Sequence, residues 1–153
     1  MQRSSVAISI TIRAARPADA VHIQALLEAE DLDDSAFVIE NFVVAEDALG
    51  GFAGCARLKP YADCVELSSV AVHPTYRGHG VGHSLVATLL RRQNLPGVYL
   101  VCEPKEVPFF QRFGFVVLSR SNVPPALEPK LRAYEAKVGA MLAMQRAGGG
   151  LTS

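Results

Sequence analysis

The sequence has no long apolar run, no excess of either charge and few cysteines. No stretch approaches the roughly 18 consecutive apolar residues of a membrane-spanning helix. The apolar patch Val6–Ile10 is shorter than the core of a signal peptide, which takes about 7–15 residues. Fifteen basic residues balance fifteen acidic ones, which argues against a nucleic-acid partner or a membrane surface. We therefore expect a cytoplasmic protein that binds neither nucleic acid nor membranes.

Cysteine and histidine form no recognisable disulfide or metal motif. The three cysteines include no C-x-x-C pair, which fits reduced thiols that serve as small core residues of an intracellular protein. Cys102 has no evident base beside it, so a core thiol is expected there rather than a nucleophile. His79 and His83 stand four residues apart without a third ligand near them in the sequence, so no metal site is expected.

The length and the apolar content fit one folded domain. The chain has 153 residues, of which 50% are hydrophobic, and a domain of that size buries roughly 70% of its unfolded surface. No internal repeat is visible. We expect a single domain over residues 1–147 and a frayed tail over residues 148–153.

Hydrophobic periodicity switches between strand and helix patterns along the chain. The expected strands are 6–13, 41–46, 52–59, 64–72, 98–102 and 115–118. The expected helices are one opened by 16–19, with Val21, Ile23, Leu26 and Leu27 on its apolar face, one at 80–92 and one at 106–113. An acidic loop with a short helix is expected at 30–40. The strand at 98–102 is apolar throughout, which is typical of burial on both faces, and residues 127–142 show helical spacing.

A glycine-rich segment joins the strand at 64–72 to the next helix. Gly78, Gly80 and Gly82 stand at a helix entrance, although glycine costs about 1 kcal/mol against alanine in a helix. A helix start presents backbone N–H groups and a partial positive charge, which attract phosphate. The spelling is neither the P-loop, which needs a lysine before Ser84, nor the G-x-G-x-x-G dinucleotide motif. An ordinary turn softened by glycine is the alternative.

Two motifs in this order resemble a known family. Arg77, Gly80 and Gly82 spell R-x-x-G-x-G directly after a strand that ends in Val70-Ala71-Val72, which resembles the acyl-coenzyme A loop of the GCN5-related N-acetyltransferases (GNAT). The stretch FFQRFGF at 109–115 is similar to the F-x-x-x-G-F signature of that family. The resemblance implies an α/β (α+β) fold with a mixed, mostly antiparallel twisted sheet. Helices would flank this sheet, and it would be splayed between the strands at 65–72 and 98–102.

Within this family, one branch is closest in style. The stretches ELSSVAVHPTYR, VPFFQRFGF and VPPALEPKLRAYEAK are similar to stand-alone amino-acid N-acetyltransferases of the N-acetylglutamate synthase kind. That branch implies acetylation of a small amino acid, with glutamate favoured, as part of arginine biosynthesis. It also implies a final strand in the tail, against the helical spacing of 127–142. Such domains often dimerise, and the apolar tail offers a surface for a homodimer.

The resemblance implies acetyl-coenzyme A (acetyl-CoA) as the acetyl donor and no metal. The loop amides and Arg77 would hold its pyrophosphate, while Val70 and Val72 would line the pantetheine arm. Val72 is a candidate catalytic residue, because backbone N–H groups near it would stabilise the oxyanion that forms during acetyl transfer. The implied cofactor-binding residues are Val70, Ala71, Val72, Arg77, Gly78, His79, Gly80, Val81, Gly82 and His83.

Glu66 is the candidate general base, acting through water. It lies four and six residues before Val70 and Val72, so the three side chains share one face of the strand unless a bulge intervenes. A bulge at this place is common in the family. The alternative is a solvated carboxylate on the strand surface.

The general acid is less well defined. Many relatives place a tyrosine where this chain has Phe110, and that tyrosine protonates the leaving thiolate. Phenylalanine at this position is similar to the glutamate-acetylating branch. The remaining possibilities are Tyr61, Tyr76 or a thiolate that leaves unassisted.

Three cations are candidates for binding an acidic substrate. Arg57 and Lys59 share one face of the strand at 52–59, and Lys105 follows the strand at 98–102. An ordinary surface position is the alternative for each. The sequence therefore predicts an acetyl-CoA-dependent N-acetyltransferase for a small amino acid. The alternatives are an enzyme for another small amine or an arsenical amino-acid analogue, and a non-catalytic acyl-CoA sensor.

Overall fold

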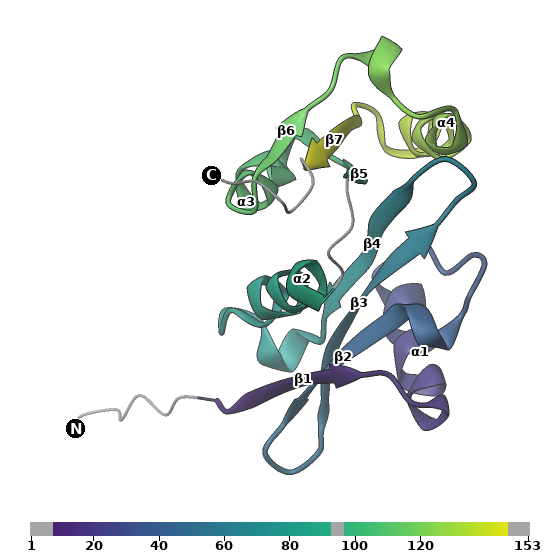
Figure 1. Ribbon diagram of the computed structural model, residues 1–153. Helices are drawn as coiled ribbons and strands as arrows, with labels where there is room; N and C mark the ends of the chain where they lie inside the picture. Colours follow the sequence, from purple (N-terminus) through teal and green to yellow (C-terminus); the bar gives the residue numbers. More distant parts are fainter. Residues whose placement is uncertain (1–7, 93–96, 147–153) are drawn as a thin grey trace. The chain divides into compact units, whose positions relative to one another are not determined.

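The computed structural model describes residues 8–92 and 97–146 (Figure 1). Within these ranges the strands are β1 (Ile10–Ala14), β2 (Phe42–Asp47), β3 (Phe52–Pro60), β4 (Val65–Val72), β5 (Val98–Cys102), β6 (Phe115–Val117) and β7 (Leu142–Arg146). The α-helices are α1 (Ala20–Ala29), α2 (Val81–Arg92), α3 (Val107–Gln111) and α4 (Glu128–Val138). The first two residues of the predicted strand at 6–13 and the predicted frayed tail at 148–153 lie outside the described residues.

In the described part of the chain, seven strands form a mixed sheet in the order β1-β2-β3-β4-β5-β7-β6. The pairs β1–β2, β2–β3, β5–β7 and β6–β7 are antiparallel. β4 and β5 are parallel, with Val65 opposite Val98 and Glu66 opposite Tyr99. The prediction of a mixed, mostly antiparallel sheet is confirmed, and the predicted splay between β4 and β5 stays a prediction.

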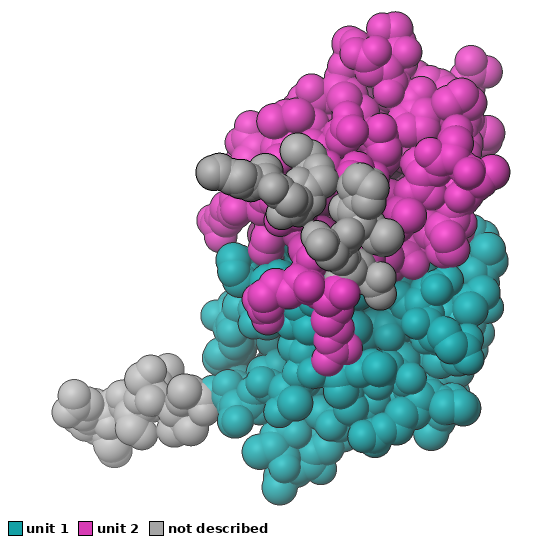
Figure 2. Space-filling view, in the orientation of Figure 1, with its two compact units in different colours: residues 1–57, 69–89 teal, residues 58–68, 90–153 magenta. Residues whose placement is uncertain are grey.

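The chain groups into two compact units, which Figure 2 shows in different colours. Unit 1 comprises residues 1–57 and 69–89, and unit 2 comprises residues 58–68 and 90–153. The boundary passes through β3, β4 and α2, so the tip formed by the end of β3 and the start of β4 belongs to unit 2. The expectation of one domain over residues 1–147 stays a prediction.

The core of unit 1 lies between α1 and the strands β2, β3 and β4. Its buried members are Ile23, Leu26, Leu27, Phe42, Val44, Cys55 and Ala71. Val21 was expected on the same face of α1 but is 66% exposed, because the buried stripe of this short helix runs through positions 23, 26 and 27. Gly54 lets β3 approach β4 closely, since a Cβ built there would lie 2.5 Å from the carbonyl oxygen of Ala71.

The core of unit 2 resolves the question of helix against strand in the tail. Leu127 and Leu131 are buried with Val123 and with Ala143 of β7, as the helical spacing predicts. The helix α4 ends at Val138, where Gly139 takes a φ of +97°. The chain then enters β7, which pairs with both β5 and β6. The final strand is therefore present, and the helical spacing is right for Leu127 and Leu131 but not for Leu142, which belongs to β7.

β5 corrects one expectation from the sequence. It was expected to be buried on both faces, but its burial alternates, with Val98, Leu100 and Cys102 buried and Tyr99 and Val101 half-buried. The half-buried side chains pack against the α4 cluster. A membrane-spanning helix is not found among the described residues, since none of the helices there is both long and apolar enough.

Candidate functional site

The loop between β4 and α2 explains the run of glycines. Gly78 and Gly80 have φ values of +82° and +75°, which glycine adopts at no steric cost. A Cβ built at either position meets no atom within 4 Å. These two glycines therefore serve the path of the backbone rather than close packing, and they leave the loop surface open.

The helix α2 begins directly after this loop. Its first intrahelical bond runs from the N–H of Ser84 to the carbonyl of Gly80 at 3.1 Å, so the amides of Val81 and Gly82 lie in the first turn, where the helix supplies no acceptor. The side chains of Val81 and Leu85 are buried and fix the helix to its unit. The helix start is a place where an anion is stabilised.

Arg77 stands at the entrance of this loop. Its Nη2 lies 2.7 Å from Oε1 of Glu30, and its Nε donates to the carbonyl of Val72 at 3.3 Å. The side chain is 52% exposed. The guanidinium is thus held near the end of β4, and it remains accessible to an anionic ligand.

Tyr76 anchors the loop to the hairpin between β2 and β3. Its hydroxyl donates a short hydrogen bond to Asp47, and this bond raises the pKa of Tyr76 and lowers that of Asp47. The N–H groups of Gly51 and Leu49 donate to the same carboxylate. Tyr76 therefore has a structural partner, which makes it a weaker candidate for the general acid.

His79 in the loop and His83 in the first turn of α2 have exposed side chains. Among the described residues there is no group of three histidine, cysteine or acidic side chains that could hold a metal ion. Burial raises the pKa of the Cys102 thiol to about 12. That thiol is neutral at physiological pH, in line with the expected core role.

β4 is irregular at Ser69, whose φ is +58°. Left-handed backbone costs a non-glycine residue roughly 1–2 kcal/mol, so the surrounding contacts must hold it. The Ser69 hydroxyl accepts from Nε of Arg57 at 3.0 Å and donates to the carbonyl of Asp33 at 2.6 Å. The Cys55 thiol lies 3.6 Å from the Ser69 carbonyl. The even spacing of Glu66 and Val70 therefore does not place them on one face.

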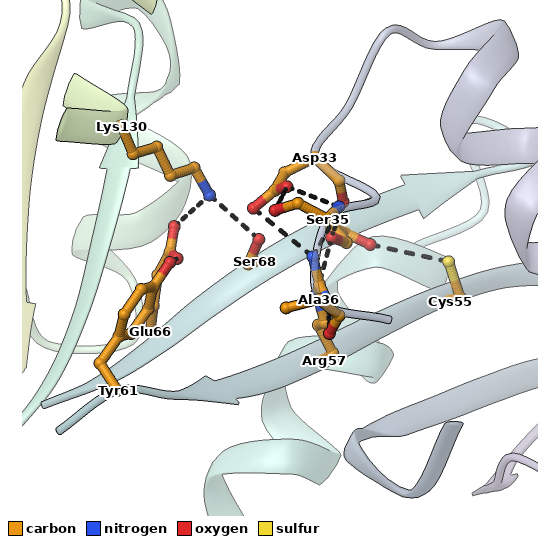
Figure 3. A network of polar contacts seen from close by, with 10 residues as sticks. Asp33, Ser35, Ala36, Cys55, Arg57, Tyr61, Glu66, Ser68 and Lys130 are labelled. Atoms are coloured by element: carbon orange, nitrogen blue, oxygen red, sulfur yellow. Dashed lines mark hydrogen bonds and ion pairs between the residues drawn. The ribbon is translucent and has the colours of Figure 1, made fainter. Parts of the chain in front are cut away.

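Arg57 contacts this irregular point of β4, and each nitrogen of its guanidinium has a polar partner (Figure 3). Besides Ser69, it donates to the carbonyls of Ala36 at 3.2 Å and Asp33 at 3.1 Å, and it lies 3.5 Å from the Asp33 carboxylate. Its side chain is 0% exposed and packs over the Phe42 ring. The surface alternative is wrong for Arg57, and its contacts favour a structural role over contact with a substrate.

Glu66 lies in a second polar cluster, which belongs to unit 2. Its Oε1 accepts from the hydroxyl of Tyr61 at 2.8 Å, and its Oε2 forms a short ion pair with Nζ of Lys130 (Figure 3). Lys130 also donates to the Ser68 hydroxyl at 3.2 Å. The Glu66 side chain is 1% exposed. The alternative of a solvated carboxylate is therefore wrong.

The other predicted cations differ in their surroundings. Lys59 is buried, and its Nζ lies 5.4 Å from the centroid of the Tyr61 ring. Lys105 is exposed in the short turn Pro104–Glu106. Phe110 is buried and makes edge contacts with Phe109 and Phe115, so it belongs to an apolar cluster and offers no proton donor.

Sequence reasoning missed Lys130, Ser69 and Asp33. Lys130 lies 64 residues from Glu66, and Asp33 lies 36 residues from Ser69. The only local signal was the position of Lys130 directly before Leu131, on the edge of the apolar stripe of α4. The left-handed backbone of Ser69 has no signal in its residue type.

A family model described as an acetyltransferase (GNAT) domain matches residues 39–117, just over half of the 153 residues. The chain belongs to this family. The match spans β2 to β6 and includes the glycine loop, Glu66 and Arg57.

Two curated relatives of this GNAT chain carry the same name. An amino-acid acetyltransferase of Mycobacterium tuberculosis (strain ATCC 25618 / H37Rv) is 33% identical over 111 residues, which are 68% of this chain and 63% of the relative. An amino-acid acetyltransferase of Ectopseudomonas mendocina (strain ymp) is 35% identical over 92 residues, which are 58% of this chain and 21% of the relative. The chain thus spans less than two thirds of the length of both relatives.

Solved structures of the same fold include complexes with coenzyme A. Rv2747 from Mycobacterium tuberculosis, in complex with CoA and NLQ, has a TM-score of 0.70 at 25% identity, covering 90% of this chain and 98% of that one. N-acetylglutamate synthase from Neisseria gonorrhoeae, complexed with coenzyme A and L-arginine, has a TM-score of 0.71 at 25% identity, covering 94% and 34%.

Glycine should be better tolerated than alanine at Ser69. Both substitutions remove the hydroxyl, but glycine accepts the φ of +58° without the left-handed penalty, so Ser69→Gly should be more stable than Ser69→Ala by about 1 kcal/mol. Urea unfolding would measure the free energies. Ser68, which does not have a positive φ, is the matched control, and there alanine should be the more stable. The same ranking at both positions would contradict the argument.

Proposed function

We propose that this chain is an N-acetyltransferase that moves an acetyl group from acetyl-CoA to the amine of a small amino acid, with glutamate favoured. The observation that carries the proposal is the open glycine loop with Arg77 at the end of β4, in a chain of the GNAT family. Glutamate as substrate would put the reaction in arginine biosynthesis. A homodimer and a cytoplasmic location belong to the same proposal.

The residues of the loop fit a pyrophosphate. The backbone at Gly78 and Gly80 is open, the amides of α2 begin at Val81, and Arg77 adds an accessible cation. His79 completes the loop, and Gly82 and His83 lie in the first turn of α2. Val70 and Val72 would line the pantetheine arm, with Ala71 between them on β4. Acetyl-CoA supplies an acetyl thioester whose thiolate is the leaving group.

Glu66 would take a proton from the substrate ammonium. A carboxylate that is buried and held by two donors has a fixed position, which general base catalysis needs. Both of its oxygens are already contacted, by Tyr61 and Lys130, so the proton would reach it through a water molecule or through the Tyr61 hydroxyl. The N–H groups near Val72 would stabilise the oxyanion.

The choice of amine depends on where positive charge faces the substrate. Lys59 and Lys105 remain the proposed partners of a substrate carboxylate. Arg57 would act on the substrate only through the loop that it holds, because Asp33 and backbone carbonyls take up its guanidinium. Because Asp33 compensates the charge of Arg57, that charge is not available to a substrate carboxylate. This favours a second candidate substrate, a small amine with one carboxylate or none.

The proposal is tested by release of free thiol from acetyl-CoA with a panel of amines. Glutamate, glutamine, aspartate, glycine and a simple alkylamine would be compared with a reaction without amine. We expect turnover above that background with at least one amino acid. Tight binding of acetyl-CoA in calorimetry without turnover on any amine would contradict the enzyme proposal and support a sensor.

Replacing Arg77 should weaken cofactor binding selectively. Arg77→Gln removes a charge-assisted contact to phosphate, which is worth about 1.5–3 kcal/mol, so the dissociation constant of acetyl-CoA should rise at least about tenfold. Calorimetry would measure it. Arg92→Gln removes the same charge from the exposed far end of α2 and should change little.

The ion pair of Arg77 with Glu30 needs its own control. Glu30→Gln breaks the pair but keeps the cation, so it should leave the dissociation constant unchanged or lower it. Weaker binding in Glu30→Gln, with no change in Arg77→Gln, would refute the role of Arg77 in binding phosphate.

Replacing Glu66 should remove turnover and leave cofactor binding intact. Loss of a general base typically costs about 10²–10⁴ in rate, so kcat of Glu66→Gln should fall at least about a hundredfold while the dissociation constant of acetyl-CoA stays the same. Glu40→Gln, on an exposed residue, is the control. Equal losses of binding and turnover, or no loss of either, would rule out Glu66 as the base.

A further inference from the structure

Lys130 reaches Glu66 from a different part of the chain. It lies on α4 directly before Leu131, which is buried in the core of unit 2. Its Nζ contacts Oε2 of Glu66 and the hydroxyl of Ser68, and its side chain is 16% exposed. All of these residues belong to unit 2.

The two oxygens of Glu66 have different partners. Lys130 donates to Oε2 as a cation, whereas Tyr61 donates to Oε1 as a neutral hydroxyl. A lysine ammonium only donates hydrogen bonds and cannot accept a proton. A tyrosine hydroxyl both donates and accepts hydrogen bonds, so it can pass a proton on. The Oε1 side is therefore the side on which a proton can move.

The ion pair between Glu66 and Lys130 adds little to the stability of the fold by itself. A buried ion pair roughly breaks even against apolar side chains of similar size, because desolvation offsets the Coulomb attraction. Removing one partner is costly, however, because the other charge is left buried. The arrangement fixes the position of the Glu66 carboxylate more than it stabilises the fold.

We propose that Lys130 is a positioning residue for acetyl transfer: it binds Oε2 and fixes the orientation of the Glu66 carboxylate, so that Oε1 receives the proton of the substrate ammonium. The inference rests on the proposed function. The ammonium gives one proton to Oε1, through water or the Tyr61 hydroxyl, and its lone pair attacks the acetyl carbon. As the C–S bond breaks, the second N–H proton goes to the thiolate, and Glu66 returns its proton to solvent.

The charged and titratable groups around Glu66 come from several elements. Lys130 faces it from α4, Tyr61 from the turn before β4, and Tyr99 lies opposite it on β5. Lys59 lies over the ring of Tyr61. Burial raises the pKa of the nearby Cys64 thiol to about 12, so this thiol is neutral over the working range. Lys130 is the cation that contacts the carboxylate directly.

The test compares Lys130→Met, Lys130→Arg and Lys137→Met, the last being an exposed lysine on the same helix. In Lys130→Met, kcat should fall at least about tenfold with the KM for acetyl-CoA unchanged. Lys130→Arg should restore most of kcat, because arginine can donate to the same carboxylate oxygen. A Lys130→Met variant that matches Lys137→Met in kcat would overturn the proposal.

A double variant separates catalysis from folding. If Lys130 acts through Glu66, then Glu66→Gln/Lys130→Met should be no slower than Glu66→Gln alone, and it should be more stable than Lys130→Met because no charge is left buried. A further drop in kcat in the double variant would overturn the proposal. Absence of turnover in the unmodified chain would instead overturn the proposed function, so the two failures are distinguishable.

Discussion

Charge buried along β3 and β4 is the constraint on which both units depend. Arg57 and Glu66 lie on neighbouring strands with almost no exposed surface, and a buried charge without a partner is prohibitively expensive. Each unit meets this demand with its own segment. The loop after α1 brings Asp33 and Ala36 to Arg57, and α4 brings Lys130 to Glu66. The two clusters thus add polar contacts to segments that also place apolar side chains in the cores.

The local part of this structure was predictable from the sequence. Strand alternation, the glycine loop and the aromatic signature are short-range patterns, and the structure has the expected strands, with α2 beginning at Val81. The φ values of Gly78 and Gly80 also answer why glycine stands there. In the tail, the spacing of Leu127 and Leu131 predicted α4, whereas β7 is a short strand that only its pairing with β5 and β6 defines.

The partners of the charged residues were not predictable. Arg57 and Lys59 look alike in the strand pattern, yet Arg57 donates to the carbonyls of Asp33 and Ala36, whereas Nζ of Lys59 lies over the ring of Tyr61. Glu66 looked like a surface carboxylate or a base acting through water, and its two donors come from 5 and 64 residues away. Such contacts depend on how the chain folds back, which residue type and spacing do not encode. The left-handed backbone of Ser69 was not predictable either, because serine as a residue type does not indicate a positive φ.

The division of the chain into two units limits how the chain can be truncated or recombined with a relative. Unit 2 is built from two segments, 58–68 and 90–153, and the first is the tip of a hairpin whose base belongs to unit 1. A truncated chain that starts at residue 90 would keep Lys130 and lose Glu66, leaving a half-buried ammonium without its counterion. The units are not separated at a single peptide bond, because their boundaries fall within β3, β4 and α2. Recombination between relatives can therefore exchange a whole unit only with crossovers inside the β3–β4 hairpin.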